Sequence, residues 1–138
     1  MAHETGYLAD PRMLTREERS LVEWLLEHGD QGAMEFFPQL ALAQVVAHCR
    51  CGCASIDFAI DGQRPKKFAM RVLSDYQWRD EQGRLFGAMV FEQDDLLAGL
   101  DLWSIDGAGI PSTLPAPALL LPYGAPFLCE RQTRVLPE

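Results

Sequence analysis

Residues 84–106, RLFGAMVFEQDDLLAGLDLWSID, decide the fold of this chain of 138 residues. Two runs rich in apolar and aromatic residues flank the dipeptide Asp94-Asp95, and Asp106-Gly107 closes the second run. Asp favours tight turns because its carboxylate accepts hydrogen bonds from backbone amides two residues ahead. The stretch therefore predicts two antiparallel strands that are joined by a short turn.

Three further segments of extended character precede this hairpin. They are QVVAHC (44–49), ASIDFAID (54–61) and KFAMRVLSDYQWRD (67–80). In the second of them, Ile56, Phe58 and Ile60 alternate with smaller or polar residues, which is the period of a half-buried strand. The polar residues 80–83 supply the next turn. Together these segments predict an antiparallel meander of about five strands, one face of which needs a cover.

Residues 15–28, TREERSLVEWLLEH, carry the clearest helical signal. Thr15 and Glu18 have the spacing of a capping box, in which each side chain bonds the backbone amide of the other residue. Apolar residues then recur at helical spacing, and His28 followed by Gly29 predicts the end of the helix. The segment predicts one amphipathic helix that packs on the sheet.

The segment 30–43, DQGAMEFFPQLALA, is ambiguous, because Pro38 either begins a short helix or breaks an irregular stretch. We favour a short turn of helix. The last thirty residues hold six prolines, which predicts an extended segment lying along the sheet or a neighbour.

These patterns predict the α+β class: one amphipathic N-terminal helix packed on the meander, with a proline-rich extended C-terminal tail. The length suits one domain, residues 1–138. Within it we expect residues 1–13 and roughly 128–138 to be flexible.

The charge balance restricts the classes of partner. Twelve Lys and Arg against twenty Asp and Glu give a net charge of −8, so the chain repels phosphate backbones and anionic membranes. RPKK, residues 64–67, is the only dense basic patch, and a solvated loop is its simplest interpretation. No secretory leader or membrane-spanning run is visible, which predicts a cytoplasmic protein that contacts neither nucleic acid nor membrane.

The stretch HCRCGC, residues 48–53, is the most suggestive chemically. Thiolates are soft ligands for zinc, and four donors can come from His48, Cys49, Cys51, Cys53 and the distant Cys129. A single C-x-C-x-C run departs from the paired C-x-x-C spacing of most structural zinc sites. A redox pair is a second interpretation, and a turn packed with thiols, in which Gly52 takes a positive φ, is a third.

The chain also resembles a group of small uncharacterised bacterial proteins, a domain of unknown function. The resemblance rests on LTREE (14–18), CRCGCASIDF (49–58), GRLFGAMVF (83–91) and LLAGLDLWSIDG (96–107), and covers most of residues 14–115. It implies a bacterial single-domain protein. It implies no activity, substrate or catalytic residue, because none is assigned to the group.

A second candidate region is the sheet face opposite the apolar residues. If the strands are neighbours, acids and aromatic rings share a surface for a ligand or protein partner; these residues are Asp57, Tyr76, Trp78, Asp101 and Trp103. The alternative is that the rings are buried under the proline-rich tail and the acids are solvated. Asp57 and Asp101 form an acid and base pair only if a pocket drives their pKa values apart.

No nucleotide-binding or hydrolase motif is present, and no nucleophile, base and orienting group form a set. We therefore predict a non-enzymatic protein- or ligand-binding domain, of the kind found in immunity or adaptor proteins. A zinc or redox thiol site at residues 48–53 is the alternative, and an enzyme with a carboxylate pair on the sheet face is the third. A homodimer through an edge strand or the tail is compatible with all three.

Overall fold

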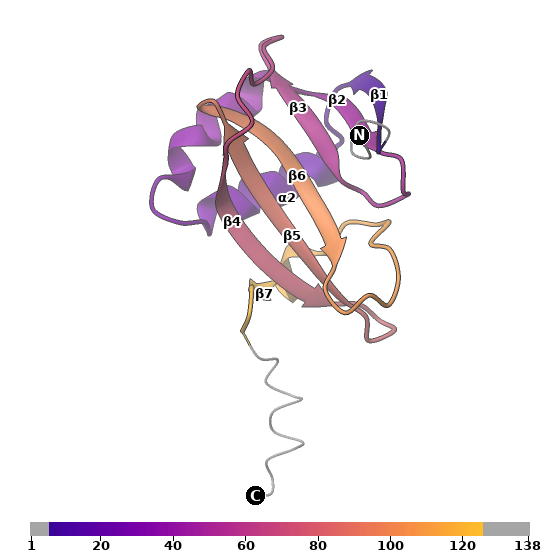
Figure 1. Cartoon of the computed structure of the whole chain (residues 1–138). Coiled ribbons are helices and arrows are strands. Elements are labelled where there is room, and N and C mark those ends of the chain that lie inside the picture. The colour runs from indigo at the N-terminus through magenta and orange to yellow at the C-terminus, as the bar shows by residue number, and fades with distance from the viewer. Residues whose placement is uncertain (1–5, 126–138) are drawn as a thin grey trace, which may run out of the picture.

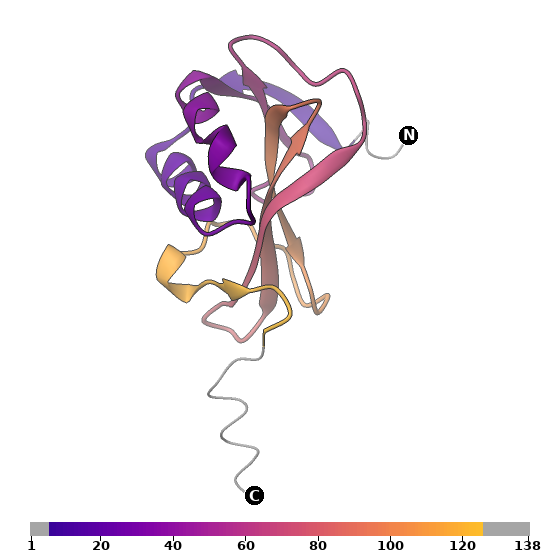
Figure 2. The same cartoon turned by 90° about the vertical axis from the view of Figure 1, so that its left-hand side faces the viewer.

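The computed structural model describes residues 6–125, which form a seven-stranded antiparallel sheet with helices against one face (Figures 1 and 2). The strands are β1 (Tyr7–Arg12), β2 (Ala43–Cys49), β3 (Ile56–Ile60), β4 (Met70–Arg79), β5 (Leu85–Gln93), β6 (Leu96–Ser104) and β7 (Leu121–Pro122). The helices are the α-helix α2 (Arg16–Glu27) and the 3-10 helices η1 (Ala33–Leu42) and η2 (Pro117–Leu119). The predicted α+β class is confirmed, and the five predicted strands correspond to β2–β6.

The strand order is β1-β2-β3-β6-β5-β4-β7, so the prediction of a simple meander is wrong. After β3 the chain crosses to the far side of the sheet, and β4, β5 and β6 then return toward β3 (Figure 1). This order places β6 in the centre, where Leu97, Ala98, Leu100 and Leu102 are all buried. A strand that is apolar along most of its length is best shielded from water between two neighbours.

The capping box of α2 forms as predicted. The Thr15 hydroxyl accepts from the Glu18 amide at 3.0 Å, and the Glu18 carboxylate accepts from the Thr15 amide at 2.9 Å. The same carboxylate binds the guanidinium of Arg12 at 2.8 Å, which ties the start of the helix to β1. The helix ends at Glu27, and the amide of the C-cap residue His28 donates to the Trp24 carbonyl. The N-terminal cap at Thr15 contributes about 1 kcal/mol.

Helix η1 closes a gap in the sheet. Strands β3 and β6 pair only at Ile56 with Leu100 and at Asp57 with Gly99, and then diverge. The Gln39 side chain accepts from the Leu97 amide at 2.7 Å and donates to the Asp95 carbonyl at 3.0 Å. The helical choice for residues 30–43 is confirmed, but the 3-10 helix begins at Ala33, so Pro38 lies inside it and does not begin it. Its side-chain hydrogen bonds replace strand pairing at this point.

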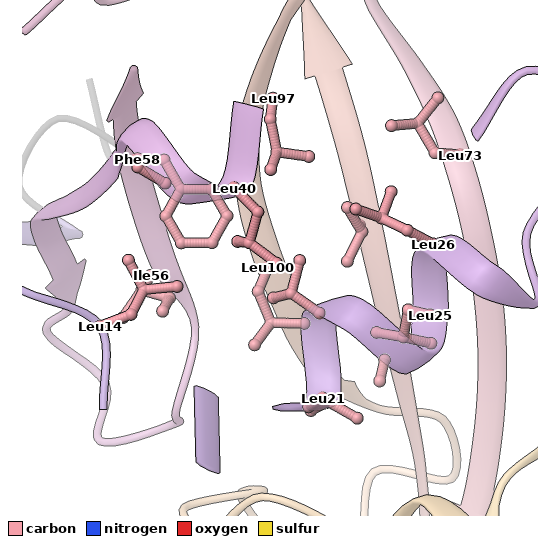
Figure 3. Close-up of a cluster of buried hydrophobic side chains, with 14 of the residues drawn as sticks. Leu14, Leu21, Leu25, Leu26, Leu40, Ile56, Phe58, Leu73, Leu97 and Leu100 are labelled. Carbon is pink, nitrogen blue, oxygen red and sulfur yellow. The ribbon is translucent and has the colours of Figure 1, made fainter. Parts of the chain in front are cut away.

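The core lies between the helices and the covered face of the sheet (Figure 3). Leu21, Leu25 and Leu26 of α2 and Leu40 of η1 belong to one buried cluster with Leu100 of β6, and Leu40 lies beside Leu100. Each of these leucines is at most 2% exposed, and burying one such side chain contributes about 2 kcal/mol. The core therefore fixes which face of each strand points toward the helices.

The other face of the sheet, which we call the open face, is turned toward the viewer in Figure 1. Directly paired residues project to the same side, so the register identifies its members. Asp75 pairs with Met89 and Met89 with Asp101; Gly87 pairs with Trp103, and Asp57 with Gly99. No helix of residues 6–125 covers this face.

Two strands were not predicted. Residues 7–12, within a segment expected to be flexible, form the edge strand β1 against β2. Leu121 and Pro122 form β7 beside Gln77 and Tyr76 of β4. The second strand agrees with the expectation that the proline-rich tail lies along the sheet. The expected flexibility of residues 128–138 lies outside the described residues.

None of the helices in residues 6–125 has the length and apolar character to cross a membrane.

Candidate metal centre

A tight turn between β2 and β3 gathers three cysteines. Strand β2 ends at Cys49, and the Cys49 amide bonds the Ser55 carbonyl at 3.1 Å across the base of the turn. The Ala54 amide bonds the Pro111 carbonyl at 2.9 Å, which anchors the turn to the loop after β6. Gly52 has φ 100°, and nothing lies within 4 Å of a Cβ placed there. Backbone conformation, and not crowding, is therefore the reason for glycine at this position.

The thiols of Cys49, Cys51 and Cys53 lie within 4.8 Å of one another. The sulfurs of Cys49 and Cys51 are 3.0 Å apart, and the Cys53 amide donates to the Cys51 sulfur at 3.3 Å. Thiolates bound to one tetrahedral ion at about 2.3 Å are roughly 3.8 Å apart. Small side-chain rotations therefore bring the three sulfurs into a metal coordination sphere.

Two of these thiols are joined by a hydrogen bond, in which the Cys49 thiol donates to the Cys51 sulfur. Burial and the hydrogen bond to Cys51 raise the pKa of Cys49 to about 12. The hydrogen bond from Cys49, helped by the Cys53 amide, lowers the pKa of Cys51. Cys51 therefore loses its proton more readily than Cys49, which is the donor of this hydrogen bond. A metal ion bound by these thiols displaces their protons and neutralises more than one thiolate at once.

His48 does not join the cluster. It pairs with Ile56 and Leu8, so it projects toward the helix side of the sheet, whereas Cys49 pairs with Tyr7 on the open face. The His48 ring is held by the Asp10 carboxylate at 3.0 Å. Within residues 6–125, these three thiols are the one group of three or more His, Cys, Asp or Glu side chains whose ligand atoms are close enough to share an ion. Cys129, the other predicted ligand, lies outside the described residues.

Ser55 connects the cysteine cluster to the acidic residues of the open face. Its hydroxyl lies 3.3 Å from the Cys53 sulfur and 3.0 Å from the Asp101 carboxylate. The same hydroxyl accepts from the Leu102 amide at 2.8 Å and is 1% exposed. The sequence predicts a strand for Ser55 but no role in a site. Its position two residues after Cys53, on the side of the strand that carries Asp57, was the available signal.

Three acidic side chains lie on the open face, in positions where their charge is poorly solvated. Burial raises the pKa of Asp57, Asp75 and Asp101, and a hydrogen bond from Ser55 partly offsets this at Asp101. The positive charge of Arg64 lowers the pKa of Asp57 and so offsets part of the effect of burial. Burial shifts the pKa values of Asp57 and Asp101 in the same direction, so it does not by itself separate an acid from a base.

Tyr7 is a site residue that the sequence analysis missed. It faces Cys49 across the β1–β2 pair. Burial raises the pKa of Tyr7, and the charges of Asp57 and Asp101 raise it further. Its hydroxyl therefore stays protonated beside the acids and thiols and can donate a hydrogen bond to an anionic group.

The predicted set of face residues is divided between the two faces. Asp57, Asp101 and Trp103 lie on the open face, but Tyr76 pairs with Ala88 and Trp78 with Phe86 on the helix side. Trp78 is 4% exposed, and the Tyr76 hydroxyl donates to the His28 carbonyl. Placing Tyr76 and Trp78 beside the acids is therefore wrong. On the helix side, the Tyr76 ring contacts Trp24 of α2 edge-on and the Trp78 ring contacts Phe86.

Trp103 lies flat over a glycine. A Cβ on Gly87 would come within 2.5 Å of the indole, so only glycine permits this approach. The Tyr123 ring is 6.1 Å from the indole, and the Gln77 side chain bonds the backbone of residues 124 and 125. The tail thus covers part of the open face beside Trp103, as the alternative interpretation of the sequence expected, but Asp57 and Asp101 are partly buried and not solvated as that interpretation also expected. Asp57 and Asp101 lie beyond this cover.

Comparisons with models of protein families, with curated proteins and with solved structures each give no match. The resemblance carried by CRCGCASIDF and the other motifs therefore stays an expectation.

Proposed function

We propose that this protein binds a soft metal ion, zinc in the first instance, through the thiolates of Cys49, Cys51 and Cys53. The observation that carries the proposal is the convergence of the three sulfurs within 4.8 Å in one turn. Thiolates packed this closely repel one another, and a divalent cation relieves that repulsion. The Cys53 amide supports the Cys51 sulfur in the way that outer hydrogen bonds support metal ligands.

Zinc prefers four ligands, so the proposal requires a fourth donor. His48 is a poor choice for two reasons. Its ring nitrogen is hydrogen-bonded to the Asp10 carboxylate, and its ring projects to the helix side of the sheet, away from the thiols. The fourth ligand is then either water or a residue outside the described range. Cys129 is the cysteine in that part of the chain. A water ligand makes the site open to exogenous ligands, whereas a fourth thiolate makes it a closed structural site.

The test uses the full chain, reduced and freed of metal with a chelator. We expect it to take up about one equivalent of zinc, measured by elemental analysis after desalting. Cobalt substitution should give the intense thiolate-to-metal absorption of a sulfur-rich site. Cys51→Ser should weaken zinc binding by at least about tenfold, because it removes a ligand. Zinc uptake that is unchanged in this variant would contradict the assignment.

Two matched variants define the ligand set. His48→Gln should retain zinc affinity, because the ring lies outside the cluster. Cys129→Ser tests Cys129 as the fourth ligand: loss of affinity equal to that of Cys51→Ser indicates four thiolates, and unchanged affinity excludes Cys129 from the site. The number of thiolates then follows from the intensity of the cobalt spectrum.

A second candidate function is the binding of a cationic protein or small ligand on the open face, as expected for an immunity- or adaptor-like domain. The observation that favours it is the placement of Asp57, Asp75 and Asp101 on one face, where burial disfavours their charge. A cation bound there relieves that cost. Asp57→Asn with Asp101→Asn should abolish such binding and leave zinc uptake intact, so the two functions are separable by the same metal measurement.

A further inference from the structure

Two of the three clustered sulfurs are closer to each other than a shared metal ion requires. The Cys49 and Cys51 sulfurs are 3.0 Å apart, whereas two thiolates bound to one tetrahedral ion are roughly 3.8 Å apart. A disulfide bond is about 2.05 Å long, so the separation of this pair lies between the two arrangements. The same two side chains can therefore reach a metal-bound form or a disulfide by small movements of opposite sign.

Cys51 is the more accessible thiol of this pair. It follows the end of β2 by two residues and is exposed, whereas Cys49, at the end of the strand, is half-buried. The next residue, Gly52, has φ 100°, and a Cβ placed there would meet nothing within 4 Å. The tip of the turn is therefore open on that side, and a dissolved oxidant reaches Cys51 first.

Cys49 is placed to react with Cys51. Its thiol donates to the Cys51 sulfur, and its backbone is held by the hydrogen bond from its amide to the Ser55 carbonyl at 3.1 Å. The third thiol, Cys53, instead donates to the Ser55 hydroxyl at 3.3 Å. The hydrogen bonds therefore select Cys49 as the partner of Cys51 and leave Cys53 outside the pair.

We propose that Cys49 and Cys51 form a reversible disulfide with a peroxide as the oxidant, and that this bond expels the metal ion from the cysteine cluster. This inference rests on the proposed function, because it concerns release of the ion that the same thiols bind. A metal ligand must be a thiolate, so a sulfur in a disulfide no longer binds the ion in that way. Oxidation thus removes two of the three clustered ligands and leaves Cys53 alone.

The oxidation proceeds in two steps. The Cys51 sulfur attacks one oxygen of hydrogen peroxide, the O–O bond breaks, and the other oxygen leaves as water with the proton of the Cys51 thiol, which gives the sulfenic acid. The Cys49 sulfur then attacks the Cys51 sulfur, the S–S bond forms, the S–O bond breaks, and the hydroxyl leaves as water with the Cys49 proton. The two thiols lose two electrons, and one peroxide becomes two waters.

The test uses the full chain, reduced, freed of metal and dilute, with hydrogen peroxide as the probe. We expect the intact mass to fall by two hydrogens. Trypsin cleaves after Arg50, so a disulfide between Cys49 and Cys51 joins two tryptic peptides until it is reduced, and fragmentation identifies the linked residues. The oxidised protein should bind zinc at least about a hundredfold more weakly than the reduced protein, and a thiol reductant should restore binding.

The mass measurement needs no metal, so this inference and the proposed function can fail separately. Suppose that the reduced protein takes up zinc but peroxide gives no disulfide between Cys49 and Cys51, or links the cluster to Cys129 or to a second molecule. The oxidation step is then wrong, and the metal site stands. If the reduced protein takes up no zinc, the proposed function is wrong, and release of metal by oxidation is wrong with it.

Two matched variants test the choice of pair by mass alone. Cys49→Ser should slow disulfide formation at least about tenfold, because the attacking thiol is gone, and dimedone should then trap the sulfenic acid on Cys51. Cys53→Ser should form the disulfide at the rate of the parent protein. Circular dichroism checks that both variants are folded. Equal slowing in the two variants, or trapping on a residue other than Cys51, would overturn the assignment.

Discussion

The hydroxyl of Ser55 lies 3.0 Å from the carboxylate of Asp101, although 46 residues separate the two in the chain. Because Ser55 also contacts the sulfur of Cys53, the thiol cluster and the acidic open face form one continuous polar region. The sequence presented them as separate candidates. The pairing of β3 with β6 joins them, since it places the end of the cysteine turn beside the middle of β6.

Ser55→Ala should lower the free energy of unfolding by about 1–3 kcal/mol, because it leaves the buried Leu102 amide without its acceptor. Urea unfolding followed by circular dichroism measures the loss. Ser20→Ala, on the exposed side of α2, is the matched control and should change stability by less than about 0.5 kcal/mol. Equal effects of the two substitutions would mean that the Ser55 hydroxyl has no structural role.

Cys51 should react with iodoacetamide faster than Cys49 at about pH 7, because the lowered pKa of Cys51 gives it the larger thiolate fraction, whereas the pKa of Cys49 is raised to about 12. Mass spectrometry of digests taken over time assigns each modification. Zinc added first should protect all three. Modification of Cys49 at the rate of Cys51 would contradict this order of reactivity.

Asp57→Asn should stabilise the protein near neutral pH. Burial raises the pKa of Asp57 in the folded state, so its favourable contribution is present below the unfolded pKa and is lost as the pH rises through the folded pKa. The variant should therefore match the parent at about pH 3 and exceed it in unfolding free energy at about pH 7. Asp95→Asn, at an exposed turn, is the control. A gain that does not depend on pH would have another cause.

Gly87→Ala should destabilise the protein by about 1–3 kcal/mol, because the new methyl group meets the Trp103 ring. The φ of Gly87 is not in the left-handed region, so displacement of the ring accounts for the loss. Urea unfolding in the Trp103→Leu background separates the contributions. The alanine substitution should cost less in that background, and an unchanged cost would show that the indole is not the obstacle.

The sequence determined the local elements of this protein. The Thr15 and Glu18 capping box, the alternation of Ile56, Phe58 and Ile60, and the turn at Asp94-Asp95 each depend on residues a few positions apart. Such interactions act before any tertiary contact forms, so their patterns are readable from the chain. The convergence of the three thiols is also local, because all three belong to one turn.

Only the tertiary structure decided which elements are neighbours and which face each side chain takes. The pairing of β3 with β6 depends on burial of the apolar β6 at the centre of the sheet, a preference that no short segment expresses. A register irregularity between Val72 and Ser74 sets the side to which the rest of β4 projects, and this directs Tyr76 and Trp78 into the core. Because side chains alternate along a strand, one extra residue exchanges the two faces. The contact between Ser55 and Asp101 follows from these long-range choices.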